Sequence, residues 1–133
     1  MKGVFNQMTV ELNKIKDFIV EWNNQNTNDF YNAAKEIWEN PELSMQEYKS
    51  SKLLIDLLKK NGFSVESGVA GMPTAFIASY GSGKPVIGIN AEYDALPGLS
   101  QDRNAVEKVP ITQGAPGHGC GHNLLGTGGV KAA

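Results

Sequence analysis

The apolar positions of the first forty residues recur at three- and four-residue spacing, which places them on one face of a helix. A first apolar stripe is formed by Leu12, Ile15, Phe18, Ile19 and Trp22. A second stripe is formed by Phe30, Ala33, Ala34, Ile37 and Trp38. The polar run 23–28 between them is poor in helix-forming residues, so the helix either breaks or weakens there. Pro41 ends the second stripe, because the residue before a proline is disfavoured in the α region.

The next helix has clear signals at both ends. Ser44 and Glu47 match the capping box, in which each side chain accepts a hydrogen bond from a free backbone N–H at the start of a helix. The apolar stripe that follows consists of Leu53, Leu54, Leu57 and Leu58. Asn61 and Gly62 then end the helix, since glycine adopts the left-handed conformation without steric cost.

After Gly62 the pattern changes to that of strands. Phe63 and Val65 predict a short strand, and residues 74–80, rich in β-branched and aromatic side chains, predict a second. Residues 86–91 predict a third strand, apolar enough to be buried on both faces. A long loop then runs from Leu96 to about residue 121, and loops of this length are often functional.

Residues 124–133 predict the opening of a further helix that carries no stop signal. The order of elements therefore predicts an α/β fold, with two or three helices, three strands, a long loop and the start of another helix. We expect it to be the first part of a layered domain and incomplete by itself, with one sheet edge unpaired.

Composition narrows the class of partner. The 133 residues carry 12 basic and 14 acidic side chains, a net charge of −2, which does not favour nucleic acid or an anionic membrane. The N-terminus lacks the apolar core of a signal peptide, and no apolar run approaches the ~20 residues of a membrane span. A single cysteine excludes an intrachain disulfide and fits a reducing compartment. These features predict a soluble cytoplasmic protein.

Residues 117–123, Gly-His-Gly-Cys-Gly-His-Asn, alternate metal-binding side chains with glycines. In an extended segment His118, Cys120 and His122 would all face one side and could bind one ion. Thiolate and imidazole together suit Zn²⁺, and imidazole suits other first-row metals. The spacing is not that of a zinc finger, so a glycine-rich loop without a metal is the alternative. A nucleophilic Cys120 beside a histidine is a second alternative.

Glu92 and Asp94 follow directly after the predicted third strand. Ligands of open α/β sheets bind beyond the carboxyl ends of strands, where two carboxylates can orient a metal-bound histidine or bind the metal. Asp94 could equally hydrogen-bond the backbone of a turn near residues 97–98. The residues by themselves leave both interpretations open.

Four motifs occur together and in one order: Asn-Pro-Glu-Leu-Ser at 40–44, Pro-Thr-Ala-Phe at 73–76, Ala-Glu-Tyr-Asp-Ala-Leu-Pro-Gly at 91–98 and the histidine–cysteine run at 117–123. In this order they resemble the M20 metallopeptidase family, in its amidohydrolase branch. The resemblance covers nearly all of residues 32–133. Within that branch, Gly-Leu-Ser-Gln at 98–101 and Asn123 look most like the p-aminobenzoyl-glutamate hydrolase group.

This resemblance implies a catalytic α/β domain with two adjacent divalent metal ions, Zn²⁺ or Mn²⁺, and an inserted smaller domain that mediates dimerisation. Cys120 and His122 match the family's metal ligands, and Asp94 matches an aspartate that supports the metal site without binding the metal. His118 matches a histidine near the site and is a further candidate ligand, with an open role. The implied reaction is hydrolysis of an amide bond by metal-activated water, in N-acyl amino acids or p-aminobenzoyl-glutamate-like substrates.

The family's catalytic glutamate, its neighbouring metal-binding glutamate, its other histidine ligands and the dimerisation (lid) domain follow this point of the chain. We therefore expect residues 1–133 to be a partial catalytic domain with at most a partial metal site, inactive alone. A homo-oligomer or a subunit partner is expected only for the full-length form. The alternative is a non-catalytic metal-binding or interaction module of the same fold.

Overall fold

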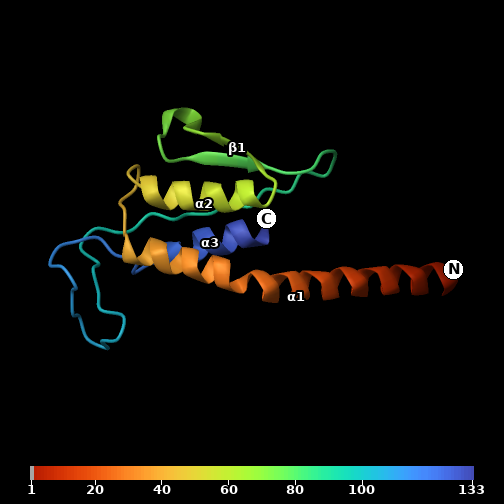
Figure 1. Ribbon diagram of the computed structural model, residues 1–133, viewed down its shortest axis with the longest axis horizontal. Helices are drawn as coiled ribbons and strands as arrows, with labels where there is room; N and C mark the ends of the chain where they lie inside the picture. Colours follow the sequence, from red (N-terminus) through yellow and green to blue (C-terminus); the bar gives the residue numbers. More distant parts are fainter. Residues whose placement is uncertain (1) are drawn as a thin grey trace.

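The structure is a computed structural model that describes residues 2–133, with side chains from Val10 onward. Its elements are α1 (Lys2–Glu39), α2 (Tyr48–Lys60), β1 (Ser64–Ser67), the 3₁₀ turn η1 (Val69–Gly71), β2 (Phe76–Ser79) and α3 (His122–Ala132). Helices α2 and α3 lie alongside one half of the long α1, and the β1–β2 hairpin lies beyond α2 (Figure 1). The predicted α/β class is confirmed. In the described part of the chain, no helix is long and apolar enough to cross a membrane.

Helix α1 is continuous through the polar run 23–28. Side chains in this run bond back to the helix itself: Asn26 Nδ2 donates to the Trp22 carbonyl at 2.8 Å, and Thr27 Oγ1 donates to the Asn23 carbonyl at 2.6 Å. These local bonds satisfy the polar side chains without breaking the helix. The predicted stop before Pro41 is confirmed, since α1 ends at Glu39.

The predicted capping box at Ser44 and Glu47 is wrong. Helix α2 begins at Tyr48, and the Glu47 side chain makes no capping hydrogen bond. The Glu42 carboxylate caps this helix instead, accepting hydrogen bonds from the Lys49 N–H at 3.0 Å and the Ser50 N–H at 2.8 Å. Between Glu42 and the start of α2 the chain turns back at Met45, whose φ is 68°. This turn brings the Glu42 carboxylate to the first backbone N–H groups of the helix. The predicted exit at residues 61–62 is confirmed, with Gly62 at a φ of 88°.

The sheet consists of two strands in the described residues. β1 pairs antiparallel with β2 in a register that joins Ser64 to Ser79 and Ser67 to Phe76. Residues 86–91, predicted as a third, doubly buried strand, are extended but unpaired, and Val86 and Ile87 are 84% and 82% exposed. That prediction is wrong in this structure, because a buried strand needs neighbouring backbones on its edges and the described chain offers none.

The core lies between α2, α3 and the C-terminal half of α1, which lie side by side in Figure 1. Its buried apolar side chains are Phe30, Ala33, Ala34, Ile37, Leu54, Leu58 and Ala95. The second predicted stripe of α1 therefore supplies most of the core. Most of the first stripe is exposed, with Ile15 54% and Phe18 66% accessible, whereas Trp22 is half-buried with its ring centroid 6.0 Å from that of Phe30.

Two glycines let α3 lie directly against the extended segment 89–93. A Cβ added at Gly126 would lie 2.8 Å from the Tyr93 Cβ, and one added at Gly129 would lie 2.8 Å from the Ala91 Cβ. Both distances are shorter than real Cβ contacts allow. The helix begins at His122, two residues before the predicted start, because Gly121 at a φ of 77° turns the chain into it.

Candidate metal centre

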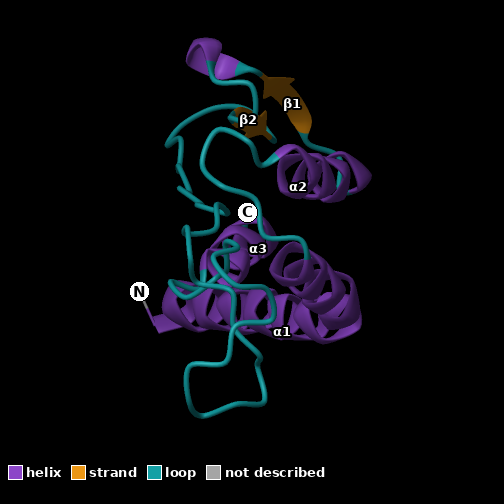
Figure 2. Cartoon of the chain, turned by 90° about the vertical axis from the view of Figure 1, so that its left-hand side faces the viewer, coloured by secondary structure: helices purple, strands orange, loops and turns teal. Residues whose placement is uncertain are grey.

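The long loop 96–121, confirmed as a loop, brings its two ends together. Leu96 and Gly117 form an antiparallel bridge in which each backbone N–H donates to the other carbonyl at 3.0 Å. A Cβ at Gly117 would lie 2.0 Å from the Leu99 carbonyl oxygen, so only glycine fits there. The loop excursion projects from the body of the molecule (Figure 2). Its closure places the segment 92–94 beside the turn 118–122.

His122 stands between two carboxylates. Its Nδ1 lies 2.7 Å from Asp94 Oδ1, and its Nε2 lies 3.2 Å from Glu92 Oε2. The His122 side chain is 13% exposed, and those of Asp94 and Glu92 are 23% and 59% exposed. The imidazole is thus held from the buried side by Asp94, while Glu92 approaches it from solvent.

This arrangement resembles the way proteins prepare a histidine to bind a metal. A carboxylate that accepts a hydrogen bond from one ring nitrogen fixes the tautomer and the ring orientation, and leaves the lone pair of the other nitrogen available. At His122 that orienting group is Asp94, and the nitrogen left for a metal is Nε2, which in this structure faces Glu92 Oε2 at 3.2 Å. The structure brings these two residues together, whereas their role toward a metal remains a prediction.

The three candidate donors of residues 118–122 do not face one side. The segment is a turn, not extended: the Gly121 N–H donates to the His118 carbonyl at 3.0 Å, and Gly121 is left-handed. His118 and His122 consequently bond to different parts of the fold, and Cys120 is exposed. Within residues 2–133, no group of three or more His, Cys, Asp or Glu side chains could hold a metal ion.

His118 points toward helix α1. Its Nε2 lies 3.1 Å from the Ile37 carbonyl, whereas its buried Nδ1 has no hydrogen-bond partner within the described chain. Burial lowers the pKa of His118 and nearby His122 lowers it further, although the bond to Ile37 and the charge of Asp94 oppose the shift. A neutral imidazole that donates from Nε2 leaves a lone pair on Nδ1, so His118 stays a candidate ligand.

The cysteine-nucleophile alternative finds little support in these contacts. A nucleophilic cysteine needs a histidine nitrogen within hydrogen-bond reach. The His122 nitrogens face Asp94 and Glu92, and His118 Nε2 bonds to Ile37. The histidine contacts are therefore those of anchored side chains, and not those of a base paired with Cys120.

Sequence reasoning missed Tyr93, which anchors the carboxylate segment from behind. Its hydroxyl donates to the Thr74 carbonyl, and its ring stacks on Phe76 with centroids 5.9 Å apart. The signal in the sequence that indicates Tyr93 is the alternation of side chains along residues 92–94. If Glu92 and Asp94 face one side of an extended chain, the residue between them faces the other.

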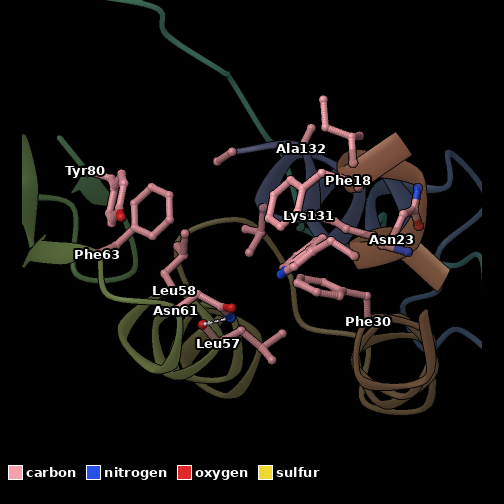
Figure 3. A pocket seen from close by; sticks show the side chains of 15 residues that line it. Phe18, Asn23, Phe30, Leu57, Leu58, Asn61, Phe63, Tyr80, Lys131 and Ala132 are labelled. Carbon is pink, nitrogen blue, oxygen red and sulfur yellow. Dashed lines mark hydrogen bonds between the residues drawn. The ribbon is translucent and has the colours of Figure 1, made fainter. Parts of the chain in front are cut away.

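The two best-defined cavities lie away from His122. One, of about 720 Å³, is lined largely by apolar side chains of α1, the end of α2 and the end of α3, with Lys131 over the Phe30 ring at 5.6 Å (Figure 3). The other, of about 690 Å³, lies between Trp38, the loop residues Leu99 and Arg103, and His118. Of the candidate site residues, His118 lines the second of these two cavities, and the others line neither.

Comparison with known proteins places the chain among peptidases and amidohydrolases. It is 44% identical over 123 residues to a p-aminobenzoyl-glutamate hydrolase of Escherichia coli (strain K12), an alignment of 92% of this chain and 25% of that protein. It is 35% identical over 115 residues to thermostable carboxypeptidase 2 of Saccharolobus solfataricus, covering 85% of this chain and 25% of that protein. It is 28% identical over 113 residues to Xaa-Arg dipeptidase of Homo sapiens, covering 75% of this chain and 22% of that protein.

These relatives confirm the predicted resemblance to the M20 metallopeptidase family, including its resemblance to the p-aminobenzoyl-glutamate hydrolase group. No protein-family model matches the chain. The chain spans about a quarter of the length of these curated relatives.

Proposed function

We propose that this chain contributes one half of a metal site for the hydrolysis of an amide bond, in N-acyl amino acids or p-aminobenzoyl-glutamate-like substrates. The observation that carries the proposal is the Asp94–His122 hydrogen bond of 2.7 Å, which fixes the imidazole with Nε2 facing the Glu92 carboxylate. The relatives support the class of reaction, because their names describe a hydrolase of p-aminobenzoyl-glutamate, a carboxypeptidase and a dipeptidase. Each of these names describes the cleavage of an amide-type bond.

The residues present fit part of the implied metal pair. His122 Nε2 and the exposed Cys120 thiol are the ligands that we assign to Zn²⁺ or Mn²⁺, and Asp94 holds His122 in place. His118 is the further candidate. A divalent metal in such a site would lower the pKa of bound water to about 7 and so supply hydroxide at neutral pH.

We further propose that these 133 residues are inactive by themselves. Catalytic zinc sites use three protein ligands together with a bound water. Within residues 2–133, no three candidate side chains gather to hold an ion. The remaining ligands and the general base would have to come from elsewhere. A non-catalytic metal-binding module of the same fold is the alternative outcome of the metal-binding and activity measurements.

The proposed partners follow from the same chemistry. The substrate is a small molecule with an amide bond, and an oligomer or a subunit partner belongs to the full-length form. The net charge of −2 supports the exclusion of nucleic acid and of anionic membranes as partners. The single cysteine supports a cytoplasmic location.

Metal binding tests the half-site directly. Zn²⁺ affinity is measured by competition with a chromophoric chelator for the 133-residue chain and for Cys120→Ser, His122→Gln and His118→Gln. We expect Cys120→Ser and His122→Gln each to weaken binding by about tenfold or more. His118→Gln is the matched control for loss of an imidazole, and a comparable loss there would add His118 to the ligands. Unchanged Zn²⁺ affinity in Cys120→Ser would show that the metal assignment is wrong.

Activity is tested with the purified chain, Zn²⁺ or Mn²⁺, and either N-acyl amino acids or p-aminobenzoyl-glutamate. We expect no turnover above that of a Cys120→Ser preparation purified in the same way, which controls for contaminating hydrolases. Turnover by the wild-type chain that Cys120→Ser abolishes would overturn the proposed inactivity, while supporting the assignment of Cys120.

A further inference from the structure

We propose that Tyr93 is a positioning residue, whose anchored side chain holds Glu92 and Asp94 against the two nitrogens of His122. A role of Tyr93 in catalysis rests on the proposed function, whereas its role in positioning Glu92 and Asp94 is independent of that function. No motif identifies Tyr93 as a site residue, and its side chain does not face the candidate metal ligands.

The first step is the alternation of side chains along the extended segment 92–94. Glu92 and Asp94 both reach His122, at 3.2 Å from Nε2 and 2.7 Å from Nδ1. Tyr93 lies between them in sequence and extends to the opposite side, where its ring stacks on Phe76 of β2 with an interplanar angle of 23°. The two carboxylates and the phenol therefore belong to one short rigid unit.

The second step is the anchor to which the phenol is bound. The Tyr93 hydroxyl donates to the Thr74 carbonyl, and the Thr74 hydroxyl donates to the Glu47 carboxylate at the start of α2. Thr74 and Glu47 are only 5% and 6% exposed. Thr74 thus accepts from Tyr93 through its backbone carbonyl and donates to Glu47 through its side chain, and these two hydrogen bonds tie the segment to α2 and to the hairpin.

The phenol is kept in its donor form. Burial, followed by the charges of Glu47 and Asp94, raises the pKa of Tyr93 to about 12. At neutral pH the hydroxyl is therefore protonated and can donate to the Thr74 carbonyl. A hydrogen bond that does not change with pH is suited to holding a neighbouring group in place.

The third step is the contact from the other side, made by α3. A Cβ added at Gly126 would lie 2.8 Å from the Tyr93 Cβ and 2.9 Å from the Glu92 carbonyl oxygen. Gly126 lies four residues after His122, on the same face of the helix. The helix face that carries His122 thus presses directly on the backbone of residues 92–93, and the hairpin contacts the Tyr93 ring from beyond it.

Loss of the phenol hydroxyl should therefore loosen the carboxylates without removing them. In Tyr93→Phe the ring can still stack on Phe76, but the bond to the Thr74 carbonyl is gone. The segment 92–94 is then fixed by one contact fewer, and the Asp94–His122 hydrogen bond is formed for a smaller fraction of the time.

The test is the ring ¹⁵N spectrum of His122 in the uniformly labelled 133-residue chain, recorded without metal at one mildly alkaline pH for all variants. His118→Gln identifies the His122 signals, since the chain has two histidines. We expect wild-type His122 to carry its proton on Nδ1, and Tyr93→Phe to shift both nitrogens toward an unbiased tautomer mixture. Tyr31→Phe is the matched control, because the Tyr31 side chain lies on α1 and is 63% exposed.

Thr74→Val provides a second variant that removes the hydroxyl bonded to Glu47 at nearly constant volume. Because the Thr74 carbonyl that accepts from Tyr93 is kept, it should shift the His122 signals in the same direction as Tyr93→Phe but by less. A wild-type His122 spectrum in folded Tyr93→Phe would overturn the proposal, even if the variant had a lower melting temperature. Lower stability with unchanged His122 signals is the signature of a purely structural residue.

Zn²⁺ titration of the same proteins connects the inference to the proposed function. We expect Tyr93→Phe to weaken Zn²⁺ binding by about 3- to 10-fold, less than the roughly 10- to 100-fold expected for a direct partner of a metal-binding histidine. Tyr31→Phe should bind like the wild type. If the wild-type chain binds no Zn²⁺, the proposed function fails, and the ¹⁵N spectra still decide whether Tyr93 positions His122.

Discussion

The two halves of α1 have the same apolar spacing but different surroundings. In the C-terminal half, Phe30 and Ile37 are 5% and 1% exposed, whereas in the N-terminal half Ile15 and Phe18 are 54% and 66% exposed. Figure 1 shows the reason: α2 and α3 lie alongside the C-terminal half only. Periodicity therefore identifies the apolar face of a helix, but a second element must be present before that face is a core.

The candidate site is built on the covered half. Asn123 Nδ2 donates to the Ala34 carbonyl at 3.1 Å, and His118 Nε2 lies 3.1 Å from the Ile37 carbonyl. Both side chains flank the turn that carries Cys120 and His122. The C-terminal half of α1 thus acts as a scaffold for the site, and the N-terminal half makes no such contact through its described side chains.

The largest expected effect contrasts one isoleucine from each half. Ile37→Ala should destabilise the chain by about 2–5 kcal/mol, because it removes buried methyl groups and leaves a cavity. Ile15→Ala deletes the same atoms from an exposed position and should cost less than about 1 kcal/mol. Urea unfolding of both variants measures the difference. Equal losses would mean that the N-terminal half is covered in solution, which would remove the contrast between the two halves.

A second contrast compares two glycines of α3, Gly126, which faces residues 92–93, and Gly128, which faces open space. Gly126→Ala should destabilise by about 1–3 kcal/mol, because its Cβ would clash with Tyr93 and the Glu92 carbonyl. Gly128 has no atom within 4 Å of an added Cβ. Gly128→Ala should therefore stabilise by up to about 1 kcal/mol through helix propensity. Thermal unfolding measures both changes, and a stabilising Gly126→Ala would show that α3 does not press on the segment 92–93.

The smallest expected effect is a pH dependence of stability. Because the folded-state pKa of Tyr93 is about 12 against an ordinary value of 10.0, its contribution is complete below pH 10 and is lost as pH rises toward 12. The stability difference between wild type and Tyr93→Phe should therefore shrink over that interval in urea unfolding experiments. A constant difference from pH 9 to 12 would mean that the phenol is not buried.

Local signals in the sequence predicted several features correctly. The stop of α1 before Pro41 and the exit of α2 at Gly62 follow from backbone chemistry that tertiary contacts rarely override. The order of the motifs identified the family resemblance. The contact between Asp94 and His122 was not predicted, because the sequence left Asp94 either as a support of the metal site or as a turn residue, and only the structure shows its partner.

Features that depend on distant contacts were predicted wrongly. The capping box failed because Glu42, five residues before Glu47, reaches the helix start, while Glu47 is bonded to Thr74. Residues 86–91 have the composition of a buried strand, yet burial requires paired neighbours on both edges. The three-donor arrangement failed because Gly121 turns the chain, and spacing alone does not reveal that turn.

The central claim is that Asp94 orients His122 for a metal, and Zn²⁺ affinity of Asp94→Ala tests it most directly. The matched control is Asp56→Ala, which removes a carboxylate that is 55% exposed and paired with Lys52 on α2. We predict that Asp94→Ala weakens Zn²⁺ binding by about 10- to 100-fold and that Asp56→Ala leaves it unchanged. Wild-type Zn²⁺ affinity in a folded Asp94→Ala chain would contradict the claim and would assign Asp94 to the turn alone.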